Sequence, residues 1–310
     1  MKKRDKIMNL EHIRYTPLLA CWKAIEQMDL AYFHSVQLPE EIRVTENILY
    51  GIAPVDHLLD IAYPAVKMNY YPLIVQVHGG GWVYGNKDTI YKAYGMALAQ
   101  KGFAVLTINY HLAPTHNFPT QLYDVDKVLR FIENNAKQYS LDPDNVFMIG
   151  DSAGAHLISS YLAIRNSRLP NPFKFEALID VKAVALSCGV YDFDTFNTPK
   201  IKFPQKTNTL RSLFGVSDYK NHPMYPWSLP SKLIESSFPD TLIISSEFDP
   251  LYPQSQQFIE RLKQENIEFE PFIAHRKLRL PHVFNTRLSY EQSVEALNKI
   301  SDFFIKRIQL

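Results

Sequence analysis

Short apolar runs recur along this chain and alternate with longer stretches in which apolar residues return every three or four positions. The runs have the length of strands, and the longer stretches have the period of amphipathic helices. We expect strands over residues 43–50, 57–64, 72–78, 103–109, 145–150, 181–188, 240–247 and 268–274. We expect helices over residues 88–101, 119–138, 153–168, 253–265 and 287–308. Such alternation predicts an α/β fold with a mostly parallel central sheet flanked by helices.

The first two predicted strands and the last predicted helix have features that place them in the fold. No helical stretch separates 43–50 from 57–64, so these two strands are expected to pair antiparallel at the edge of the sheet. The last helix has an apolar stripe that is expected to pack on the sheet, made of Val294, Leu297, Ile300, Phe304 and Ile308.

Two segments do not fit the alternation. Residues 1–40 contain a helical run from about Leu18 to Phe33, and residues 192–236 are rich in aromatic side chains but irregular. An irregular aromatic insertion suits a lid with an acyl-binding wall, whereas an edge excursion with its own small core is the alternative. We expect one α/β domain over 1–310, with a cap formed from about 1–40 and 192–236.

The strand-like run 146–149 leads into Gly150-Asp151-Ser152-Ala153-Gly154, and a helical stretch follows. A Gly-x-Ser-x-Gly turn between a strand and a helix is typical of a nucleophile elbow, which holds a serine hydroxyl exposed at the top of a sheet. The same five letters also occur in ordinary surface loops. The strand before and the helix after favour the elbow, with Ser152 as the nucleophile.

A second motif, His78-Gly79-Gly80-Gly81-Trp82, follows the apolar run 73–77. Attack of a serine on a carbonyl produces an oxyanion, which is stabilised by backbone N–H donors already pointing at it. Consecutive glycines let the substrate approach such donors closely. A flexible turn is the alternative, but the pairing with the elbow favours an oxyanion loop. The N–H of Ala153, directly after the nucleophile, is expected to contribute as well.

Together these motifs resemble the hormone-sensitive-lipase-like branch of the α/β-hydrolase esterases. Further likeness lies in Asn109-Tyr110-His111-Leu112-Ala113-Pro114, in Glu247-Phe248-Asp249-Pro250-Leu251 and in Pro281-His282-Val283-Phe284. The resemblance implies a cofactor-free hydrolase of short- to medium-chain carboxylic esters. It also implies that Gly80 and Gly81 join Ala153 in the oxyanion hole. Thr115, Ala155 and Tyr252 depart from the usual pattern of that branch.

The triad of this fold follows the chain order Ser, acid, His. His282 and His275 both follow the strand at 268–274, and only the likeness around Pro281 selects His282 as the base. Asp249 begins a loop and is the expected acid. The alternatives to that acid are Glu247, Asp240 and Asp192. His156 and His78 are expected to be structural, and Asp151 to make a structural hydrogen bond.

These residues predict a serine hydrolase that forms an acyl-enzyme on Ser152. The alternative on the same scaffold is an amide or formamide hydrolase, which would use the same triad. Some plant hormone receptors resemble this family but lack the base histidine, so the presence of Ser152, Asp249 and His282 argues against a binding protein.

The composition of the chain indicates which classes of binding partner to expect. The chain has 310 residues, 46% of them hydrophobic, and a net charge of +1, which provides no electrostatic basis for binding nucleic acid. No apolar run suggests a signal peptide or a membrane span. Cys21 and Cys188 are expected to be buried, reduced thiols, and the cytoplasm is the expected location. We expect a small-molecule ester as ligand, neither cofactor nor metal, and a homodimer as a candidate assembly.

Overall fold

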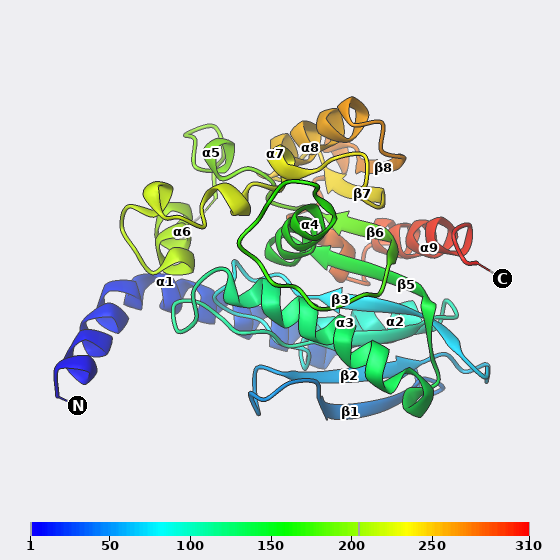
Figure 1. The fold of residues 1–310 in the computed structure, drawn as a ribbon. Coiled ribbons are helices and arrows are strands. Elements are labelled where there is room, and N and C mark those ends of the chain that lie inside the picture. The colour runs from blue at the N-terminus through cyan, green and yellow to red at the C-terminus, as the bar shows by residue number, and fades with distance from the viewer. Residues whose placement is uncertain (1, 204, 310) are drawn as a thin grey trace.

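The computed structural model describes residues 2–203 and 205–309, and Figure 1 shows their fold. Side chains are described from residue 15 onward. Its strands in these ranges form one sheet of eight, in the order β1-β2-β4-β3-β5-β6-β7-β8. They are β1 (Arg43–Leu49), β2 (Leu58–Tyr63), β3 (Tyr71–Val77), β4 (Ala104–Ile108), β5 (Leu141–Asp151), β6 (Val181–Ser187), β7 (Asp240–Ser246) and β8 (Phe269–Ala274). β1 with β2 and β2 with β4 pair antiparallel, and the other neighbours pair parallel. The predicted α/β fold and the antiparallel edge pair are confirmed.

The predicted helices are present, with ends shifted by a few residues. They are α2 (Ile90–Ala99), α3 (Thr120–Tyr139), α4 (Ala153–Asn166), α8 (Tyr252–Gln264) and α9 (Glu291–Ile305). The N-terminal helical run is longer than expected and forms α1 (Lys2–Ser35). Shorter helical segments are α5 (Phe193–Phe196), α6 (Lys206–Phe214), η1 (Tyr219–Asn221), η2 (Pro226–Ser228), α7 (Pro230–Leu233), η3 (Arg276–Leu278) and η4 (Phe284–Thr286).

Helices cover both faces of the sheet because successive strand side chains point to opposite sides. In β3, Leu73 and Val75 belong to the core that includes α3, α4 and α8. Ile74, between them, belongs to the core that includes α2 and α9. The central strands are therefore apolar at nearly every position, as expected for a parallel sheet that is buried on both faces.

The stripe predicted for α9 is only partly right. Leu297, Ile300 and Phe304 are buried, but Val294 is 46% exposed. The buried stripe begins at Ser293 instead, whose hydroxyl donates to the carbonyl of Phe284 at 2.7 Å. This hydrogen bond sets the rotation of the first turn against η4, so Val294 points away from the core. Ile308 lies beyond the end of α9 and is partly buried.

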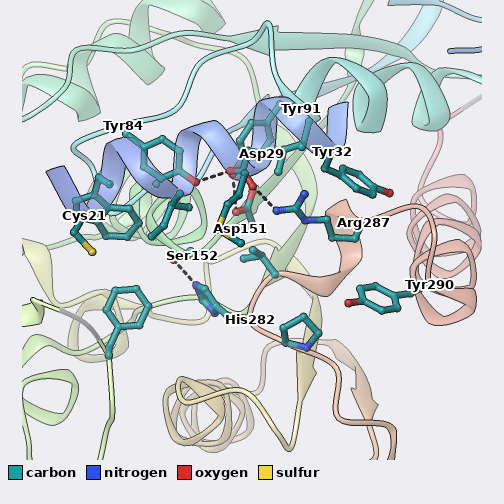
Figure 2. A pocket seen from close by; sticks show the side chains of 18 of the residues that line it. Cys21, Asp29, Tyr32, Tyr84, Tyr91, Asp151, Ser152, His282, Arg287 and Tyr290 are labelled. Carbon is teal, nitrogen blue, oxygen red and sulfur yellow. Dashed lines mark hydrogen bonds and ion pairs between the residues drawn. The ribbon is translucent and has the colours of Figure 1, made fainter. Parts of the chain in front are cut away.

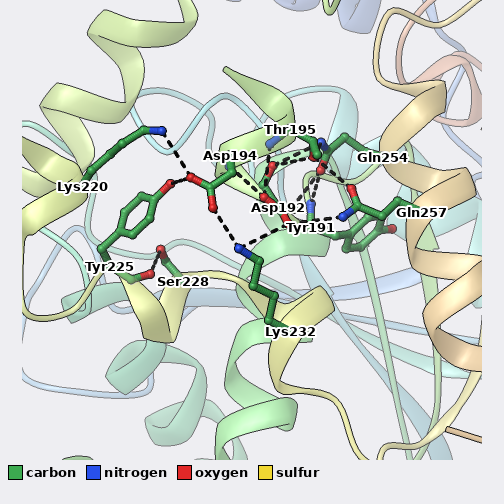
Figure 3. A network of polar contacts seen from close by, with 10 residues as sticks. All are labelled: Tyr191, Asp192, Asp194, Thr195, Lys220, Tyr225, Ser228, Lys232, Gln254 and Gln257. Carbon is green, nitrogen blue, oxygen red and sulfur yellow. Dashed lines mark hydrogen bonds and ion pairs between the residues drawn. The ribbon is translucent and has the colours of Figure 1, made fainter. Parts of the chain in front are cut away.

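A polar network organises the segment from 192 to 236 (Figure 3). The Asp192 carboxylate accepts hydrogen bonds from the N–H groups of Asp194 and Thr195 and so caps α5. The Asp194 carboxylate in turn accepts from the Tyr225 hydroxyl and the Lys232 ammonium, each at 2.8 Å. These bonds join α5, η2 and α7 into one unit.

That unit is attached to the body of the fold through α8. The Gln254 side chain of α8 accepts hydrogen bonds from the N–H groups of Tyr191 and Asp192 and donates to the Thr195 hydroxyl (Figure 3). Gln254 is fully buried, so these contacts satisfy polar groups that have no access to water. The start of the segment is thereby fixed beside the carboxyl end of β6.

Helix α1 lies across the loops at the carboxyl ends of the strands. Tyr15, Leu18 and Trp22 pack with Val83 and Ala113 in a small separate core. Farther along the helix, the Asp29 carboxylate accepts a 2.7 Å hydrogen bond from the Tyr84 hydroxyl. These contacts hold the helix over the glycine run and the loop that follows it.

Candidate active site

Ser152 lies in the one-residue turn between β5 and α4. Its backbone has φ 50° and ψ −112°, in a region that L residues seldom occupy. The turn is possible because its neighbours are small: a β-carbon on Gly154 would lie 2.1 Å from the carbonyl oxygen of Val77. The Ser152 N–H donates to the Ser187 carbonyl at 2.8 Å, which ties the turn to β6. This is the strained elbow that the sequence predicts.

The structure brings Ser152, His282 and Asp249 together. His282 Nε2 lies 3.0 Å from Ser152 Oγ (Figure 2). His282 Nδ1 lies 2.9 Å from Asp249 Oδ2. The other Asp249 oxygen accepts the N–H of Leu251 at 2.7 Å. Because an ionised carboxylate only accepts, Nδ1 carries the proton and Nε2 faces the serine hydroxyl with its lone pair.

The electrostatics of the pair agree with this assignment. Burial alone would lower the pKa of His282, but the charge and hydrogen bond of Asp249 outweigh burial and raise that pKa above its ordinary value. Burial alone would raise the pKa of Asp249, and the charge and hydrogen bond of His282 bring it below its ordinary value. The arrangement therefore favours a carboxylate next to an imidazole that gains a proton readily.

The competing acids and the competing base lie elsewhere. His275 is 63% exposed, with its nearest carboxylate oxygen, on Glu247, 4.0 Å away. Glu247 accepts the N–H of Arg276, Asp240 pairs with Arg307, and Asp192 caps α5. Among the described residues, none of these four side chains makes a hydrogen bond or ion pair with Ser152 or His282.

The two histidines expected to be structural are buried and hydrogen-bonded. His156 accepts from the Trp82 indole N–H at 3.2 Å and donates to the Ser228 carbonyl at 3.1 Å. His78 bonds the carbonyl of Gly79 and stacks on the ring of Tyr110. Burial lowers the pKa of each to about 4, so both rings are neutral near pH 7. They shape the loops around the serine.

Two of the three predicted oxyanion donors lie beside Ser152 in the structure. Gly80 lines the same cavity as Ser152, Gly81 follows it in the chain, and Ala153 is the first residue of α4. Gly80 has φ +104°, a conformation that favours glycine, and its carbonyl accepts the N–H groups of Val83 and Tyr84. Within the described ranges, the N–H groups of Gly80, Gly81 and Ala153 have no protein acceptor. They remain available for a developing oxyanion.

A cavity of about 510 Å³ opens beside Ser152 and His282 (Figure 2). Helix α1 supplies much of its wall through Trp22, Ile25 and Met28. Phe203 closes another side, with its ring centroid 5.6 Å from that of His282. The volume and the apolar wall are appropriate for a small organic ligand.

One end of the cavity is polar. Asp29 forms an ion pair with Arg287 in addition to its hydrogen bond from Tyr84 (Figure 2). Asp151 lies nearby and accepts a 2.9 Å hydrogen bond from the Tyr91 hydroxyl. Burial raises the pKa of Asp151 to about 7, and the charge of Asp29 adds to this rise, while Tyr91 and His282 oppose it. The structural hydrogen bond expected for Asp151 is present.

Sequence reasoning missed the polar end of the cavity. Asp29, Tyr84 and Arg287 come from three distant segments, and none belongs to a motif that would mark it. One expectation about the thiols was wrong: Cys21 is only half-buried and lines the cavity, because that side of α1 faces the opening and not the core. Cys188 is buried as expected, and both are free thiols.

The chain is similar in sequence to known esterases. The sequence model of the BD-FAE family matches residues 59–262, about two thirds of the chain. The chain is 28% identical over 218 residues to "Esterase LipQ" and 26% identical over 239 residues to "Carboxylesterase NlhH", both from Mycobacterium tuberculosis. These alignments cover 68% and 76% of this chain, and 50% and 74% of the relatives. The chain thus spans only about half the length of LipQ.

Solved structures show the same fold. Esterase B from Lactobacillus Rhamnosis superposes with a TM-score of 0.85, with 96% of this chain and 95% of that chain covered, at 23% identity. Identity at that level establishes the common fold alone. Among the helices of the described residues, none has both the length and the apolar character that crossing a membrane requires.

Proposed function

Because this chain belongs to the BD-FAE family of α/β-hydrolase esterases, we propose that it is a carboxylesterase whose nucleophile is Ser152. The observation that carries the proposal is the continuous hydrogen-bonded series from Asp249 through His282 to Ser152 Oγ, at 2.9 and 3.0 Å, beside a cavity. A nucleophile, a base and an orienting acid in this order are the groups that acyl transfer requires. The similarity to LipQ, an esterase, and to NlhH, a carboxylesterase, supports an ester as the substrate.

The proposed reaction proceeds in two halves. Ser152 Oγ attacks the ester carbonyl carbon while His282 Nε2 takes the hydroxyl proton, and the new imidazolium is stabilised by Asp249. The tetrahedral intermediate collapses as His282 returns the proton to the departing alcohol, which leaves an acyl group on Ser152. Water then attacks the acyl group with His282 again as base, and the acid is released.

The oxyanion of both tetrahedral intermediates is assigned to the N–H groups of Gly80, Gly81 and Ala153. The positive φ of Gly80 and the start of α4 at Ala153 support this assignment, because a donor held by its backbone needs little reorganisation as charge develops. Loss of one such donor typically costs about 3 kcal/mol of transition-state stabilisation. The reaction as drawn uses only side chains and backbone groups of this chain and a water molecule.

Within this family we further propose that the chain belongs to the hormone-sensitive-lipase-like branch. The support is the combination of the His78–Gly81 run with the Gly150–Gly154 elbow and the loops around Asp249 and His282. Short- to medium-chain acyl groups are the proposed substrates, because Trp22, Ile25, Met28 and Phe203 give the cavity a limited apolar wall. Helix α1 and the segment 192–236 are proposed to act together as the cap.

The test is a comparison of kcat/KM on p-nitrophenyl acetate, butyrate, octanoate and palmitate, with an aryl formamide of similar size to butyrate. Ser152→Ala protein serves as the control for adventitious hydrolysis. The proposal predicts the highest kcat/KM among acetate, butyrate and octanoate, and a lower value on the formamide. A preference for the formamide would replace the esterase assignment with an amidase, and a preference for palmitate would contradict the proposed acyl range.

A further inference from the structure

A second cluster of polar side chains lies outside the cavity, where the segment before β2 meets the loop between β4 and α3 and the first turns of α3. It contains Asp56, His57, His111, His116 and Asp124. None of the five lines the cavity beside Ser152. The esterase mechanism makes no use of them.

We propose that Asp56, His111 and His116 form a binding site for a divalent transition-metal ion of the zinc type. One ligand atom from each of the three residues lies within 4.8 Å of the other two. His111 Nε2 is 3.7 Å from Asp56 Oδ2, and the ring centroids of His111 and His116 are 4.1 Å apart. Tetrahedral zinc with bonds of about 2.1 Å needs ligand atoms about 3.4 Å apart, so a small rotation of half-buried side chains closes the site.

Hydrogen bonds hold His111 in the form that binds metals. Its Nδ1 lies 2.8 Å from Asp124 Oδ2, which also accepts the His111 backbone N–H at 3.0 Å. The carboxylate only accepts, so Nδ1 carries the proton and Nε2 presents its lone pair toward Asp56 and His116. A carboxylate behind a ligating histidine is the usual arrangement in zinc sites, because it fixes the ring and increases its basicity.

His57 and Asp124, the other two residues of the cluster, orient His111 and are not proposed as metal ligands. His57 Nε2 lies 2.8 Å from the other oxygen of Asp124, and His57 Nδ1 accepts the N–H of Ala53 at 3.0 Å. Both nitrogens of His57 are therefore occupied. Lys127 also donates to Asp124, at 3.0 Å. Asp124 is thus fixed as an orienting group, whereas the His116 ring nitrogens make no hydrogen bond to any described residue.

The ligand types and spacing are those of a transition-metal site. His111 and His116 are separated by four residues, within the three to five that are common between paired zinc histidines. Two imidazoles and one carboxylate suit zinc and its neighbours in the first transition row better than calcium or magnesium, which take oxygen ligands. Three protein ligands leave a fourth position for water.

An ion at this place would connect the segment before β2 to the loop that supports the glycine run. The loop that carries His111 and His116 also contains Ala113, whose N–H donates to the Trp82 carbonyl at 2.9 Å. Tyr110, next to His111, donates its hydroxyl to the carbonyl of His78 at 3.0 Å. The expected consequence of binding is a more stable loop and a higher melting temperature, since the ion binds the native state preferentially.

The experiment titrates metal-stripped full-length protein with Zn²⁺ by calorimetry and with Co²⁺ by visible absorption. His116→Ala and Asp56→Asn remove one ligand each. His275→Ala controls for exposed histidines, and His282→Ala controls for binding at a separate group of metal-ligating side chains, Cys188, Asp249 and His282. Thermal unfolding without metal verifies that each variant is folded, and Asp56→Asn is isosteric at a half-exposed position.

The proposal predicts one equivalent of Zn²⁺ bound to wild type, with tetrahedral Co²⁺ bands and a metal-dependent rise in melting temperature. It predicts the same for His275→Ala and His282→Ala, and at least tenfold weaker binding for His116→Ala and Asp56→Asn. Absence of binding to wild type, undiminished binding to both ligand variants, or loss of binding only in His282→Ala would overturn it.

Discussion

At the scale of single residues, the site depends on backbone conformation as much as on side-chain chemistry. Ser152 has φ 50°, and that strain is maintained because Gly154 packs against the carbonyl of Val77 with no space for a β-carbon. The sequence predicts this turn because a Gly-x-Ser-x-Gly pattern that directly follows a strand and precedes a helix is typical of a nucleophile elbow. It contains no comparable signal for Asp29 or Arg287, whose importance arises only from tertiary packing.

The base can be tested with a matched pair of histidine variants. His282→Ala is expected to reduce kcat/KM on p-nitrophenyl butyrate by about 10⁴-fold or more, because the serine loses its proton acceptor. His275→Ala is expected to stay within about twofold of wild type, because that side chain is exposed and remote from Ser152. Steady-state kinetics of both proteins measure this, and a larger loss for His275→Ala would transfer the role of base.

Asp151 makes stability depend on pH in a definite direction. Burial raises its pKa in the folded protein to about 7, above the ordinary value of 3.8, so the native state holds a proton that the unfolded state has lost. The contribution of protonated Asp151 to the free energy of unfolding is therefore fully present below about pH 4. It is lost as the pH rises toward and through about 7. Asp151→Asn keeps the shape without the ionisable group.

We therefore expect the melting temperature of wild type to fall relative to that of Asp151→Asn between pH 5 and pH 8. Differential scanning calorimetry at several pH values measures the difference in melting temperature between the two proteins. All other titratable groups are common to both, so the pH dependence of this difference reports on Asp151. A difference that is flat with pH, or that grows in favour of wild type as the pH rises, would contradict a neutral buried carboxyl at this position.

At the scale of elements, hydrophobic periodicity predicts the strands of the sheet and the long helices that cover it. It does not predict the structure of the segment 192–236. For each of its aromatic side chains the sequence leaves open an acyl wall or a small separate core, and the structure contains both kinds of position. Phe203 lines the cavity, but Phe193, Phe214 and Tyr225 are buried among other rings. Sequence alone cannot separate these positions, because no regular period relates them.

Because Phe203 lines the cavity and Phe214 is buried in the core, their substitution is expected to have different consequences. Phe203→Ala is expected to raise relative activity on octanoate over butyrate by several-fold, because it enlarges the cavity beside His282 while leaving the triad intact. Phe214→Ala is expected to leave that ratio unchanged and to destabilise the protein by about 3–5 kcal/mol, since its ring is buried against Phe118, Tyr219 and Tyr225. Chain-length profiles and denaturant unfolding distinguish the two effects, and exchange of the two outcomes would refute the proposed wall.

At the scale of the whole molecule, the fold brings together residues that are far apart in the chain. Ser152 follows β5, Asp249 follows β7 and His282 follows β8, and the parallel strands end at the same edge of the sheet. The order of these elements is predictable from alternating hydrophobicity, and the position of Ser152 from the elbow motif. The choice of His282 over His275 depends on the family resemblance around Pro281. The cavity and the cluster at Asp56 are not predictable, because each combines segments that share no local pattern. The cytoplasmic location and the homodimer stay predictions.

The most direct measurement of the central claim is kcat/KM for p-nitrophenyl butyrate with Ser152→Ala, beside wild type and with identical melting curves as proof of folding. The account predicts a fall of about 10⁴-fold or more, because no other hydroxyl in the described residues lies against His282 Nε2. It also predicts that a phosphonate ester modifies wild type at Ser152 and leaves the variant unmodified. Hydrolysis near the wild-type rate by Ser152→Ala would contradict the nucleophile and, with it, the mechanism built on His282 and Asp249.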